Sequence, residues 1–307
     1  MKVLVTGGNG MLGRAVRRLA EGRADLEIFA PGRADVDLSD RAAVDACMAS
    51  GGFDAVVHLA ARVGGIQANI ASPADFYLEN TIINTNVIDS AHRHGIQTLI
   101  NIGSSCMYPK DHGESLSEGD ILAAPLEPTN EGYAISKIAA AKHCSYLSQQ
   151  YGRDYRTLIP CNLYGPGDDF APERSHLLAA VIKKISDAVE AGANEVEIWG
   201  DGTARREFLF VDDLAGYVLD CLDRVADLPD MLNVGAGTDE TVNDYHRIAA
   251  EIIGYTGGFT HDLSRPVGMK RKLLDISLAR QHKWRPSTPL GDGLAQTYAF
   301  YRNGLNE

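Results

Sequence analysis

Residues 2–13, KVLVTGGNGMLG, decide the fold of this 307-residue chain. The apolar run at its start predicts a buried strand, and the periodicity over residues 11–22 predicts the helix that follows. The turn between them carries three glycines spaced three residues apart, Gly7, Gly10 and Gly13. Such a turn lets the backbone approach a pyrophosphate, to which the helix start presents free N–H groups. The segment predicts a dinucleotide-binding βαβ unit, although its spacing differs from the commoner GxGxxG.

Strands and helices continue to alternate along the first half of the chain. The expected strands are LEIFA (26–30), DAVVHLAA (54–61), QTLINIGSS (97–105) and RTLIPCNLYG (156–165), and the expected helices cover residues 40–50, 73–94 and 131–151. Parallel strands need crossover connections, and the crossover helices cover both faces of the sheet. We therefore expect an α/β fold with a doubly wound parallel sheet.

The pattern loosens after residues 165–167, Gly-Pro-Gly, where we expect a smaller substrate-binding α/β lobe. Its expected helices lie near residues 174–191, 242–254 and 291–303. Residues 206–222, REFLFVDDLAGYVLDCL, predict a strand and a helix that return the chain to the sheet. The expected domains are therefore discontinuous: residues 1–165 with about 205–235 bind the nucleotide, and residues 166–204 with 236–307 form the substrate lobe.

Composition excludes several classes of protein. The formal net charge of -12 argues against a nucleic-acid binder, which needs a basic surface to displace counterions. The five cysteines lack CxxC spacing, so we expect neither a disulfide framework nor a metal site, and a reducing cytoplasm fits best. We also expect no signal peptide and no membrane partner, because no uncharged apolar run is long enough to span a bilayer.

The residues after the second expected strand bear on the choice between NAD and NADP. That strand should end near residues 29–30, where an acid would bind the ribose of NAD, but the sequence continues Pro-Gly-Arg33. Arg33 can neutralise a 2′-phosphate, which favours NADP. If the strand ends later, Asp35 or Asp37 would be the ribose-binding acid, and Arg33 would be an ordinary loop charge.

Tyr133 and Lys137, in YAISK, lie four residues apart and therefore on one face of the helix expected over 131–151. A nearby ammonium stabilises phenolate, which lets a tyrosine exchange protons near neutral pH. Ser104, at the end of a strand, would donate a hydrogen bond to a substrate carbonyl oxygen. A tyrosine–lysine pair alone is more often a surface feature, but with the glycine turn and the serine it predicts an oxidoreductase acting on a carbonyl.

Motifs along almost the whole chain resemble those of the GDP-L-fucose synthase family of extended short-chain dehydrogenases/reductases. They are TGGNGMLG, HLAARVGGI, GSSCMYPK, EPTNEGYAISK, NLYGPGDDF, SH, WGDGTARREFLFVDDLA, NVG and RKLLD. GSSCMYPK and SH are the more specific of these. The resemblance implies a Rossmann-type fold and a homodimer that uses NADPH. It implies 3,5-epimerisation and then 4-reduction of GDP-4-keto-6-deoxy-D-mannose to GDP-L-fucose.

The resemblance also implies individual roles. Cys106 would be the base and His176 the acid of the epimerisations, at carbons whose carbanions delocalise into the neighbouring ketone as enolates. A cysteine acts as a base when it is a thiolate, which a nearby cation favours. Ser104 and Tyr133 would polarise the carbonyl oxygen, and Lys137 would also hold the cofactor ribose. Taken alone, Cys106 would more often be a small buried apolar residue, and His176 a residue at a helix start.

The expected cofactor-binding residues follow the strand ends: Gly7, Gly8, Asn9, Gly10, Met11, Leu12, Gly13, Arg33, Asp37, Leu38, Leu59, Ala60, Ala61, Ile102, Gly103, Lys137, Pro160, Asn162, Leu163 and His176. The expected substrate contacts are Ser104, Asn162, Lys184, Trp199, Arg206 and Arg271. Arg206 suits a diphosphate, because a planar guanidinium forms paired charge-assisted hydrogen bonds.

Three positions depart from the family pattern. Lys184 replaces an arginine and loses its bidentate fork, and Asn9 stands where some members carry an arginine near the 2′-phosphate. Val267 replaces an aspartate expected to touch the substrate, while the basic run 270–272 either holds phosphate or is a solvated face. An enzyme for another GDP-linked 4-keto sugar, of a colitose or heptose pathway, therefore stays an alternative. A non-catalytic dinucleotide sensor is disfavoured, since it would be expected to have lost Tyr133 or the lysine after it.

The helix expected over residues 73–94 carries two semi-apolar stripes, one through Phe76 and Val87 and the other through Tyr77 and Ile88. Two such stripes predict contacts on two sides of the helix. A dimer interface and burial under a loop both explain them, and the resemblance favours the dimer.

Overall fold

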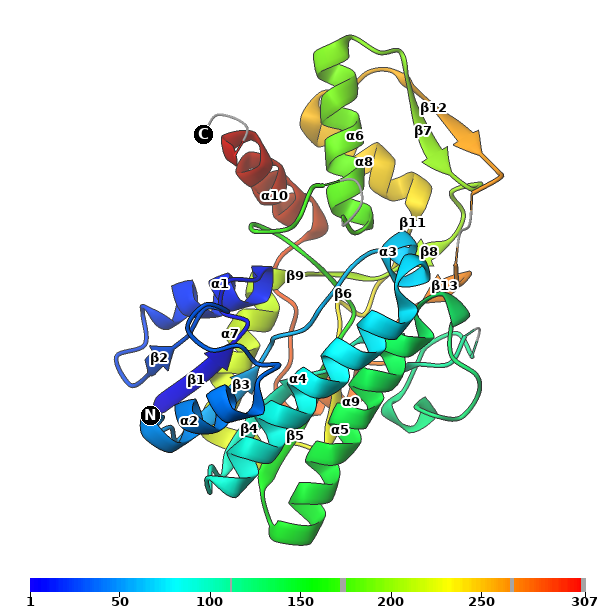
Figure 1. Ribbon diagram of the computed structural model, residues 1–307. Helices are drawn as coiled ribbons and strands as arrows, with labels where there is room; N and C mark the ends of the chain where they lie inside the picture. Colours follow the sequence, from blue (N-terminus) through cyan, green and yellow to red (C-terminus); the bar gives the residue numbers. More distant parts are fainter. Residues whose placement is uncertain (111, 172–174, 266–267, 305–307) are drawn as a thin grey trace.

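The computed structural model describes residues 1–110, 112–171, 175–265 and 268–304 (Figure 1). Its strands are β1 (Lys2–Thr6), β2 (Glu27–Phe29), β3 (Ala55–His58), β4 (Thr98–Ile102), β5 (Asp154–Pro160), β6 (Asn162–Tyr164), β7 (Glu195–Trp199), β8 (Arg205–Arg206), β9 (Phe208–Phe210), β10 (Met231–Val234), β11 (Glu240–Thr241), β12 (Gly258–Asp262) and β13 (Arg271–Lys272). Its α-helices are α1 (Met11–Ala20), α2 (Arg41–Gly51), α3 (Ile66–Ala71), α4 (Pro73–Arg93), α5 (Glu131–Tyr151), α6 (Leu177–Ala191), α7 (Val211–Cys221), α8 (Val242–Ile253), α9 (Ser277–Gln281) and α10 (Leu290–Gly304).

A six-stranded parallel sheet in the order β10-β5-β4-β3-β1-β2 confirms the predicted doubly wound fold. The chain passes from β1 outward to β2 and then crosses to β3 on the other side of β1. A crevice therefore opens between the carboxyl ends of β1 and β3, which is where such sheets bind ligands.

Alternate side chains of the strands pack on opposite faces of this sheet. Val3 and Val5 of β1 join a core with residues of α1 and α7, whereas Leu4 joins a core with residues of α2, α4 and α5. In Figure 1, α4 and α5 run side by side across the near face. Burial on both faces explains why these strands have nearly continuous apolar sequences.

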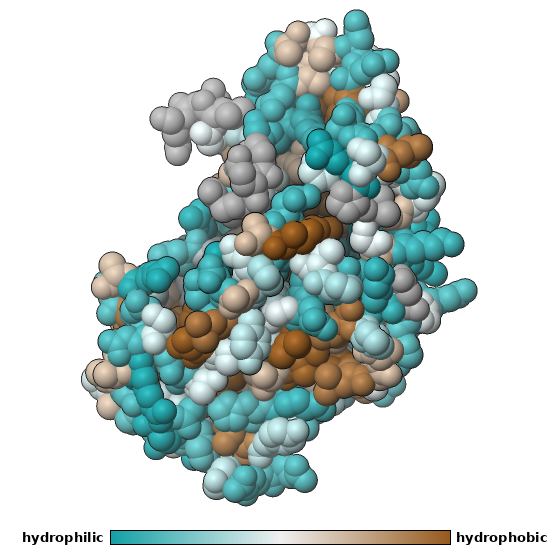
Figure 2. All heavy atoms as spheres, turned by 45° about the vertical axis from the view of Figure 1, so that its right-hand side comes forward, coloured by the Kyte–Doolittle hydropathy of each residue, from teal (hydrophilic) through white to brown (hydrophobic). Residues whose placement is uncertain are grey.

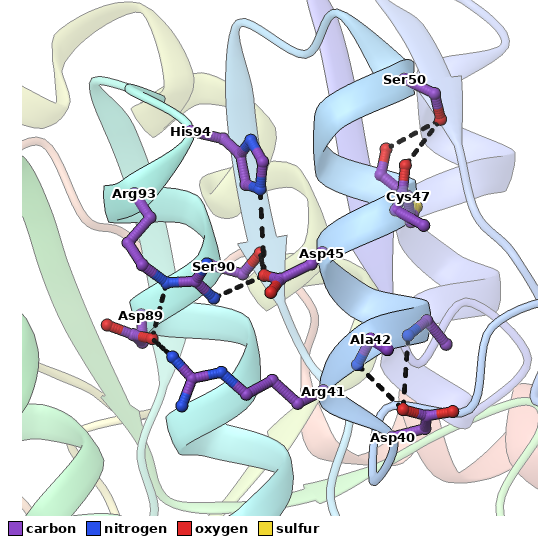
Figure 3. Close-up of polar contacts among 12 residues, drawn as sticks. Asp40, Arg41, Ala42, Asp45, Cys47, Ser50, Asp89, Ser90, Arg93 and His94 are labelled. Carbon is purple, nitrogen blue, oxygen red and sulfur yellow. Dashed lines mark hydrogen bonds and ion pairs between the residues drawn. The ribbon is translucent and has the colours of Figure 1, made fainter.

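Ion pairs add to the contact between α2 and α4 (Figure 3). Asp89 of α4 accepts from both Arg41 and Arg93 at 2.9 Å, and Asp45 of α2 accepts from Ser90 at 2.6 Å. Partly exposed pairs of this kind contribute at most about 1 kcal/mol each. The apolar core between these helices and the sheet therefore contributes more to their packing.

Two predictions about the strands are wrong. The strand expected after Arg206 does not join the main sheet, because β9 pairs with β6 in a separate two-stranded sheet. RTLIPCNLYG is likewise divided at Cys161, and only β5 belongs to the main sheet. Both segments are short and mostly apolar, so their pattern predicts a strand without specifying its partner. The chain returns to the main sheet later, with β10.

The smaller lobe contains α6, α8, α10 and the β7–β12 pair, which lie above the main sheet in Figure 1. Its core is partly aromatic and includes Phe208, Tyr245 and Tyr301. Residues 274–284 pack instead in the core of the main sheet, through Leu274 and Trp284 among others. The exact domain boundaries stay a prediction. Among the described helices, none is both long enough and apolar enough to cross a membrane.

Candidate active site

The glycine turn lies at the crevice of the main sheet, where the loops after β1 and β3 touch. Gly7 has a φ of +72°, and a Cβ there would lie 2.8 Å from the backbone nitrogen of Ala60. A Cβ on Gly13 would lie 2.2 Å from the carbonyl oxygen of Gly7. Gly10 gives α1 no side-chain cap, and the first turn of α1 carries no acidic residue. The helix start therefore keeps free N–H groups for a pyrophosphate, so the turn fits a dinucleotide.

Basic side chains gather beyond β2, which ends at Phe29 as predicted. Arg33 is exposed in the following loop. Arg17 of α1, which sequence reasoning missed, donates to Asn9 Oδ1 at 3.4 Å, and Asn9 Nδ2 would lie 3.3 Å from a Cβ on Gly32. The spacing of eight residues, about two helical turns, is the signal that could have linked Arg17 to Asn9.

The two acids considered for the ribose are engaged in turns of this loop. Asp35 accepts from the backbone of Gly32 at 2.9 Å, and Asp37 accepts from the hydroxyl of Ser39 at 2.7 Å. The bonds from Ser39 also hold the pKa of Asp37 below its usual value. This arrangement suits a 2′-phosphate better than a free 2′-hydroxyl.

The other expected cofactor residues follow the carboxyl ends of neighbouring strands. Leu59, Ala60 and Ala61 follow β3, Ile102 and Gly103 end β4, Pro160 ends β5, and Asn162 and Leu163 lie in β6. Gly8 is the second residue of the glycine turn, Met11 and Leu12 begin α1, and Leu38 lies in the loop after β2. The side chain of Leu12 faces the core, so only its backbone can face a ligand.

Ser104, Tyr133 and Lys137 come together at the end of β4. Ser104 accepts from the backbone nitrogen of Cys106 at 3.2 Å, and its side chain is near enough to Tyr133 to lower the pKa of the phenol. Lys137 is 2% exposed, and its Nζ donates to the carbonyl oxygen of Ile102 at 2.8 Å. The three side chains thus lie where a carbonyl group could be held and protonated.

Burial shifts the pKa values of both Tyr133 and Lys137. It raises the pKa of Tyr133, with a further contribution from Cys106, whereas Ser104 opposes the rise. It lowers the pKa of Lys137 to about 8. Lys137 Nζ is directed at the carbonyl oxygen of Ile102 and lies 6.0 Å from the centre of the tyrosine ring. The expected assistance of the ammonium to the tyrosine stays a prediction.

A buried polar network, which sequence reasoning missed, connects the turn of α5 that contains Ser136 to the main sheet. His58 Nδ1 lies 2.7 Å from the hydroxyl of Thr6, and His58 Nε2 lies 3.0 Å from Asn84 Oδ1. Asn84 in turn donates to the carbonyl oxygen of Ser136 at 3.3 Å. Burial, with a smaller effect of Lys137, lowers the pKa of His58 to about 3, so the imidazole is neutral. The sequence signal for this network was His58, a histidine at the end of an otherwise apolar strand.

Cys106 lies next to a hydrogen-bond donor and a cation. Asn130 Nδ2 is 3.1 Å from its Sγ, and Lys272 Nζ is 3.6 Å from it. Lys272 comes from β13, which pairs with β8. The sequence left the role of the basic run open and gave no role to Asn130. Cys106 Sγ therefore faces both an amide donor and an ammonium group.

Arg271, expected to bind substrate, points elsewhere. Its Nε lies 2.6 Å from Asp239 Oδ2, and Arg205 pairs with the same carboxylate at 3.0 Å. Asp239 is buried, and both arginines lower its pKa against the effect of burial. Arg271 therefore joins β13 to its neighbouring strands, next to the lysine that reaches Cys106.

His176 directly precedes α6. The residue keeps accessible surface, yet the protein packed around its ring lowers its pKa by desolvation. Lys272 lowers this pKa further, whereas Asp169 raises it. Cys106 and His176 thus both lie within the electrostatic influence of Lys272.

The remaining expected substrate contacts are spread over the smaller lobe. Trp199 is 39% exposed, with Lys184 Nζ 5.1 Å and Arg265 Cζ 4.9 Å from a ring centre. Sequence reasoning missed Arg265. Arg206 is partly buried in β8, and burial lowers its pKa. Val267 lies outside the described residues.

The fold and this site are those of an enzyme that uses a dinucleotide cofactor and acts on carbonyl groups. The chain belongs to the NAD dependent epimerase/dehydratase family, whose model matches residues 3–235. It is 46% identical over 303 residues to a GDP-L-fucose synthase of Azorhizobium caulinodans, covering 99% of this chain and 97% of that protein. It is 41% identical over 307 residues to a GDP-L-colitose synthase of Yersinia pseudotuberculosis, covering 100% of this chain and 99% of that protein.

A solved relative has the same overall fold. It is a GDP-mannoheptose C4 reductase of Campylobacter jejuni with NADP bound, 28% identical, with a TM-score of 0.87 over 98% of each chain.

Proposed function

We propose that this chain converts GDP-4-keto-6-deoxy-D-mannose to GDP-L-fucose by 3,5-epimerisation and NADPH-dependent 4-reduction. One observation carries the proposal. A cysteine with a cation 3.6 Å from its Sγ lies beside the Ser104, Tyr133 and Lys137 group, so a base for epimerisation adjoins a set suited to reduction. The full-length similarity to GDP-L-fucose synthases supports the same reaction.

The described residues fit NADPH, which would supply the hydride for the reduction. The proposed pyrophosphate contact is the uncapped start of α1, and the proposed contacts for the 2′-phosphate are Arg33 and Arg17. Lys137 would hold the nicotinamide ribose. Tyr133, protonated in this structure, would give its proton to the substrate oxygen as the carbonyl is reduced.

For each epimerisation we propose that the Cys106 thiolate removes a proton from the carbon next to the ketone. The electron pair of the broken C–H bond moves into the carbonyl, and the enolate oxygen is held by Ser104 and Tyr133. The charged form of His176 would return a proton to the opposite face of the same carbon. Before the second epimerisation, the Cys106 thiol would release its proton to solvent and His176 would take one up from it. Lys272 Nζ, 3.6 Å from Cys106 Sγ, would be the cation that faces the base. Burial lowers the pKa of His176, and Lys272 lowers it further.

The proposed contacts of the nucleotide lie in the smaller lobe. Lys184 and Arg265 flank the ring of Trp199, and such a set can hold a base or a phosphate. Arg206 would bind the diphosphate through its planar guanidinium. Asn162 would contribute a polar contact from β6. Arg271 would act indirectly by holding β13 through its pair with Asp239.

The alternative substrate is another GDP-linked 4-keto sugar. The relative named GDP-L-colitose synthase matches the whole chain at 41% identity, and the GDP-mannoheptose C4 reductase has the same fold. Lys184 and Val267, which depart from the family pattern, are the positions that motivate this alternative. A non-catalytic dinucleotide sensor is not favoured, since the Tyr133 and Lys137 pair is complete.

We also propose a cytoplasmic homodimer formed through α4 and α5. Large apolar side chains are exposed on both helices, namely Tyr77 and Leu78 of α4 and Ile135 and Tyr146 of α5. Figure 2 shows apolar patches on the lower half of the molecule, which carries these helices. All five cysteines are free, which suits a reducing compartment. Sedimentation velocity tests the dimer.

The deciding experiment follows NADPH absorbance with GDP-4-keto-6-deoxy-D-mannose and identifies the product sugar, with NADH tested in parallel. The expected result is NADPH oxidation with formation of GDP-L-fucose. Turnover to an unepimerised 4-hydroxy sugar would refute the epimerase half of the proposal. If NADPH binds but this sugar is not reduced, the colitose and heptose precursors become the candidates.

A further inference from the structure

A short segment of the main-sheet domain reaches the smaller lobe beside His176. It comprises residues 62–66, between β3 and the first residue of α3, and is called the strap below. A Cβ on Gly65 would lie 3.2 Å from the carbonyl oxygen of Ser175, the residue before His176. Among the described residues beyond the chain neighbours of Gly65, that oxygen is the only heavy atom within 4 Å of such a Cβ. The strap therefore meets the smaller lobe next to the proposed acid.

Two buried asparagines hold the strap on the main-sheet domain. Asn80 of α4 accepts from the backbone nitrogen of Arg62 at 2.9 Å and donates to its carbonyl oxygen at 3.0 Å. Asn69 of α3 donates to the carbonyl oxygens of Gly64 and Gly65 at 2.9 and 3.0 Å. Hydrogen bonds from buried side chains compete little with water, so they fix the backbone of the strap relative to α3 and α4.

The last residue of the strap lies near the segment that supplies Lys272. Gly268 precedes β13, and a Cβ on Gly268 would lie 3.8 Å from Ile66 Cδ1. The same Cβ would lie 3.5 Å from Nη2 of Arg206, the proposed contact of the diphosphate. In Figure 1, α3 lies where the helices of the main-sheet domain meet the smaller lobe. The strap is thus a fixed point of the main-sheet domain between two segments that carry proposed site residues.

We propose that the strap positions His176 for proton transfer, and that the glycine at position 65 is what lets Ser175 approach it. Gly65 has a φ of −64° and a ψ of 178°, a conformation open to any residue, so space rather than backbone freedom accounts for the glycine. A side chain at this position would push Ser175 away by a few tenths of an ångström, and the next residue, His176, with it. Gly65 is therefore a positioning residue. The role of His176 as the acid rests on the proposed function.

The first experiment reports the surroundings of His176 without any substrate. Its imidazole is titrated by NMR, and its signal is assigned by its loss in His176→Gln. Burial lowers the pKa of this imidazole, Asp169 raises it and Lys272 lowers it, so a displacement of the ring changes the pKa. Gly65→Val should shift this pKa, and Gly65→Ala, which adds the Cβ alone, should shift it less in the same direction.

Two further variants accompany this titration. Asn69→Ala removes both hydrogen bonds to the strap without adding bulk, and it should also shift the pKa of His176. Gly291→Val is the matched control, at an exposed position in the first turn of α10 where the described chain leaves open space around an added Cβ. It should titrate like the unchanged protein. Melting curves show which variants are folded, and Asn69→Ala answers the same question if Gly65→Val is not.

The second experiment separates inversion of the sugar from hydride transfer. Inversion is measured as GDP-L-fucose formed from the 4-keto sugar, and hydride transfer in reverse, as reduction of NADP⁺ by GDP-L-fucose, which needs no epimerisation. Gly65→Val should slow inversion roughly ten- to a hundredfold, because a misplacement of about 1 Å can cost about a hundredfold in rate. Reverse hydride transfer should stay near that of the unchanged protein, because Ser104, Tyr133 and Lys137 come from β4 and α5.

The titration decides the inference, and the kinetics decide the role of His176. A shifted pKa in folded Gly65→Val, with none in Gly291→Val, supports the inference. An unshifted pKa in Gly65→Val, or an equal shift in Gly291→Val, overturns it. A shifted pKa with unchanged inversion supports the positioning of His176 by the strap and removes His176 from the role of acid. The inference and the proposed function can therefore fail separately.

Discussion

Replacing Lys137 by methionine should stabilise the protein while abolishing its reductase activity. Lys137 is 2% exposed, and burial lowers its pKa from 10.5 to about 8. At about 1.4 kcal/mol for each tenfold change in proton affinity, charging this group costs the folded state about 3 kcal/mol at pH 7. The variant also loses the donor to the carbonyl oxygen of Ile102, worth about 1 kcal/mol. The expected net gain at pH 7 is about 2 kcal/mol.

The sign of the pH dependence makes this prediction specific. Below pH 8 the lysine is charged in both states, so the whole penalty is present. As the pH rises from about 8 to 10.5, the folded protein has lost this proton while the unfolded chain still binds it, and the penalty disappears. The advantage of Lys137→Met should therefore fall by about 2 kcal/mol between pH 7 and pH 10.

Urea unfolding of both proteins at the two pH values measures this difference. Lys142→Met, on the same helix α5 at a less buried position, is the control for the loss of a lysine from this helix. The reasoning would be refuted if Lys137→Met were less stable than the unchanged protein at pH 7 and if the difference in unfolding free energy between the two proteins did not vary with pH.

Three further substitutions test the proposed chemistry. Cys106→Ser should keep NADPH binding but lose solvent deuterium exchange into the 4-keto sugar, and undiminished exchange would remove Cys106 from the role of base. Tyr133→Phe should lower NADPH oxidation by about 10²- to 10⁴-fold, the usual contribution of a general acid, whereas near-normal turnover would contradict its role as proton donor. Arg33→Ser should raise the KM for NADPH about tenfold or more and leave that for NADH unchanged, because a charge-assisted bond is worth about 1.5–3 kcal/mol; an equal effect on both cofactors would contradict a 2′-phosphate contact.

The main sheet could be predicted from sequence because its signals are local. The glycine turn, the alternation of strands and helices, and the long helices α4 and α5 depend on near neighbours in the chain, and α5 spans the residues expected for it. The partner of the strand after Arg206 could not be predicted, because a short buried apolar run fits any sheet. Among the candidate site residues, Ser104, Tyr133 and Lys137 could be grouped in advance because their spacing and strand position carry a signal.

Contacts between distant segments were the part that sequence could not supply. Lys272 is 166 residues from Cys106 in the chain, and the sequence alone did not distinguish its role from that of Arg271 next to it. Adjacent residues of a strand point to opposite sides. The pairing of β13 with β8 therefore decides which of the two reaches the cysteine and which reaches Asp239.

The proposed reductase and epimerase groups come from different parts of the fold. Ser104 follows β4 of the main sheet, and Tyr133 and Lys137 lie on α5, which packs against that sheet. The cation beside Cys106 comes from β13, and His176 precedes α6 of the smaller lobe. Glu207 ties these parts together, since its buried carboxylate accepts from the backbone of Gly237 at 2.7 Å and of Leu274 at 2.9 Å, just beyond Lys272.

His176 thus precedes a helix of the smaller lobe, whereas Lys272 lies two residues before Leu274, which packs in the core of the main sheet. The proposed epimerisation would depend on two groups from outside the main sheet, and the proposed proton donor for reduction on none. Changes that loosen the attachment of β13 should consequently reduce proton exchange at the carbons flanking the ketone before they reduce hydride transfer. A chain of this design could become a plain 4-reductase through changes in its smaller lobe alone, with the Ser104, Tyr133 and Lys137 group unchanged.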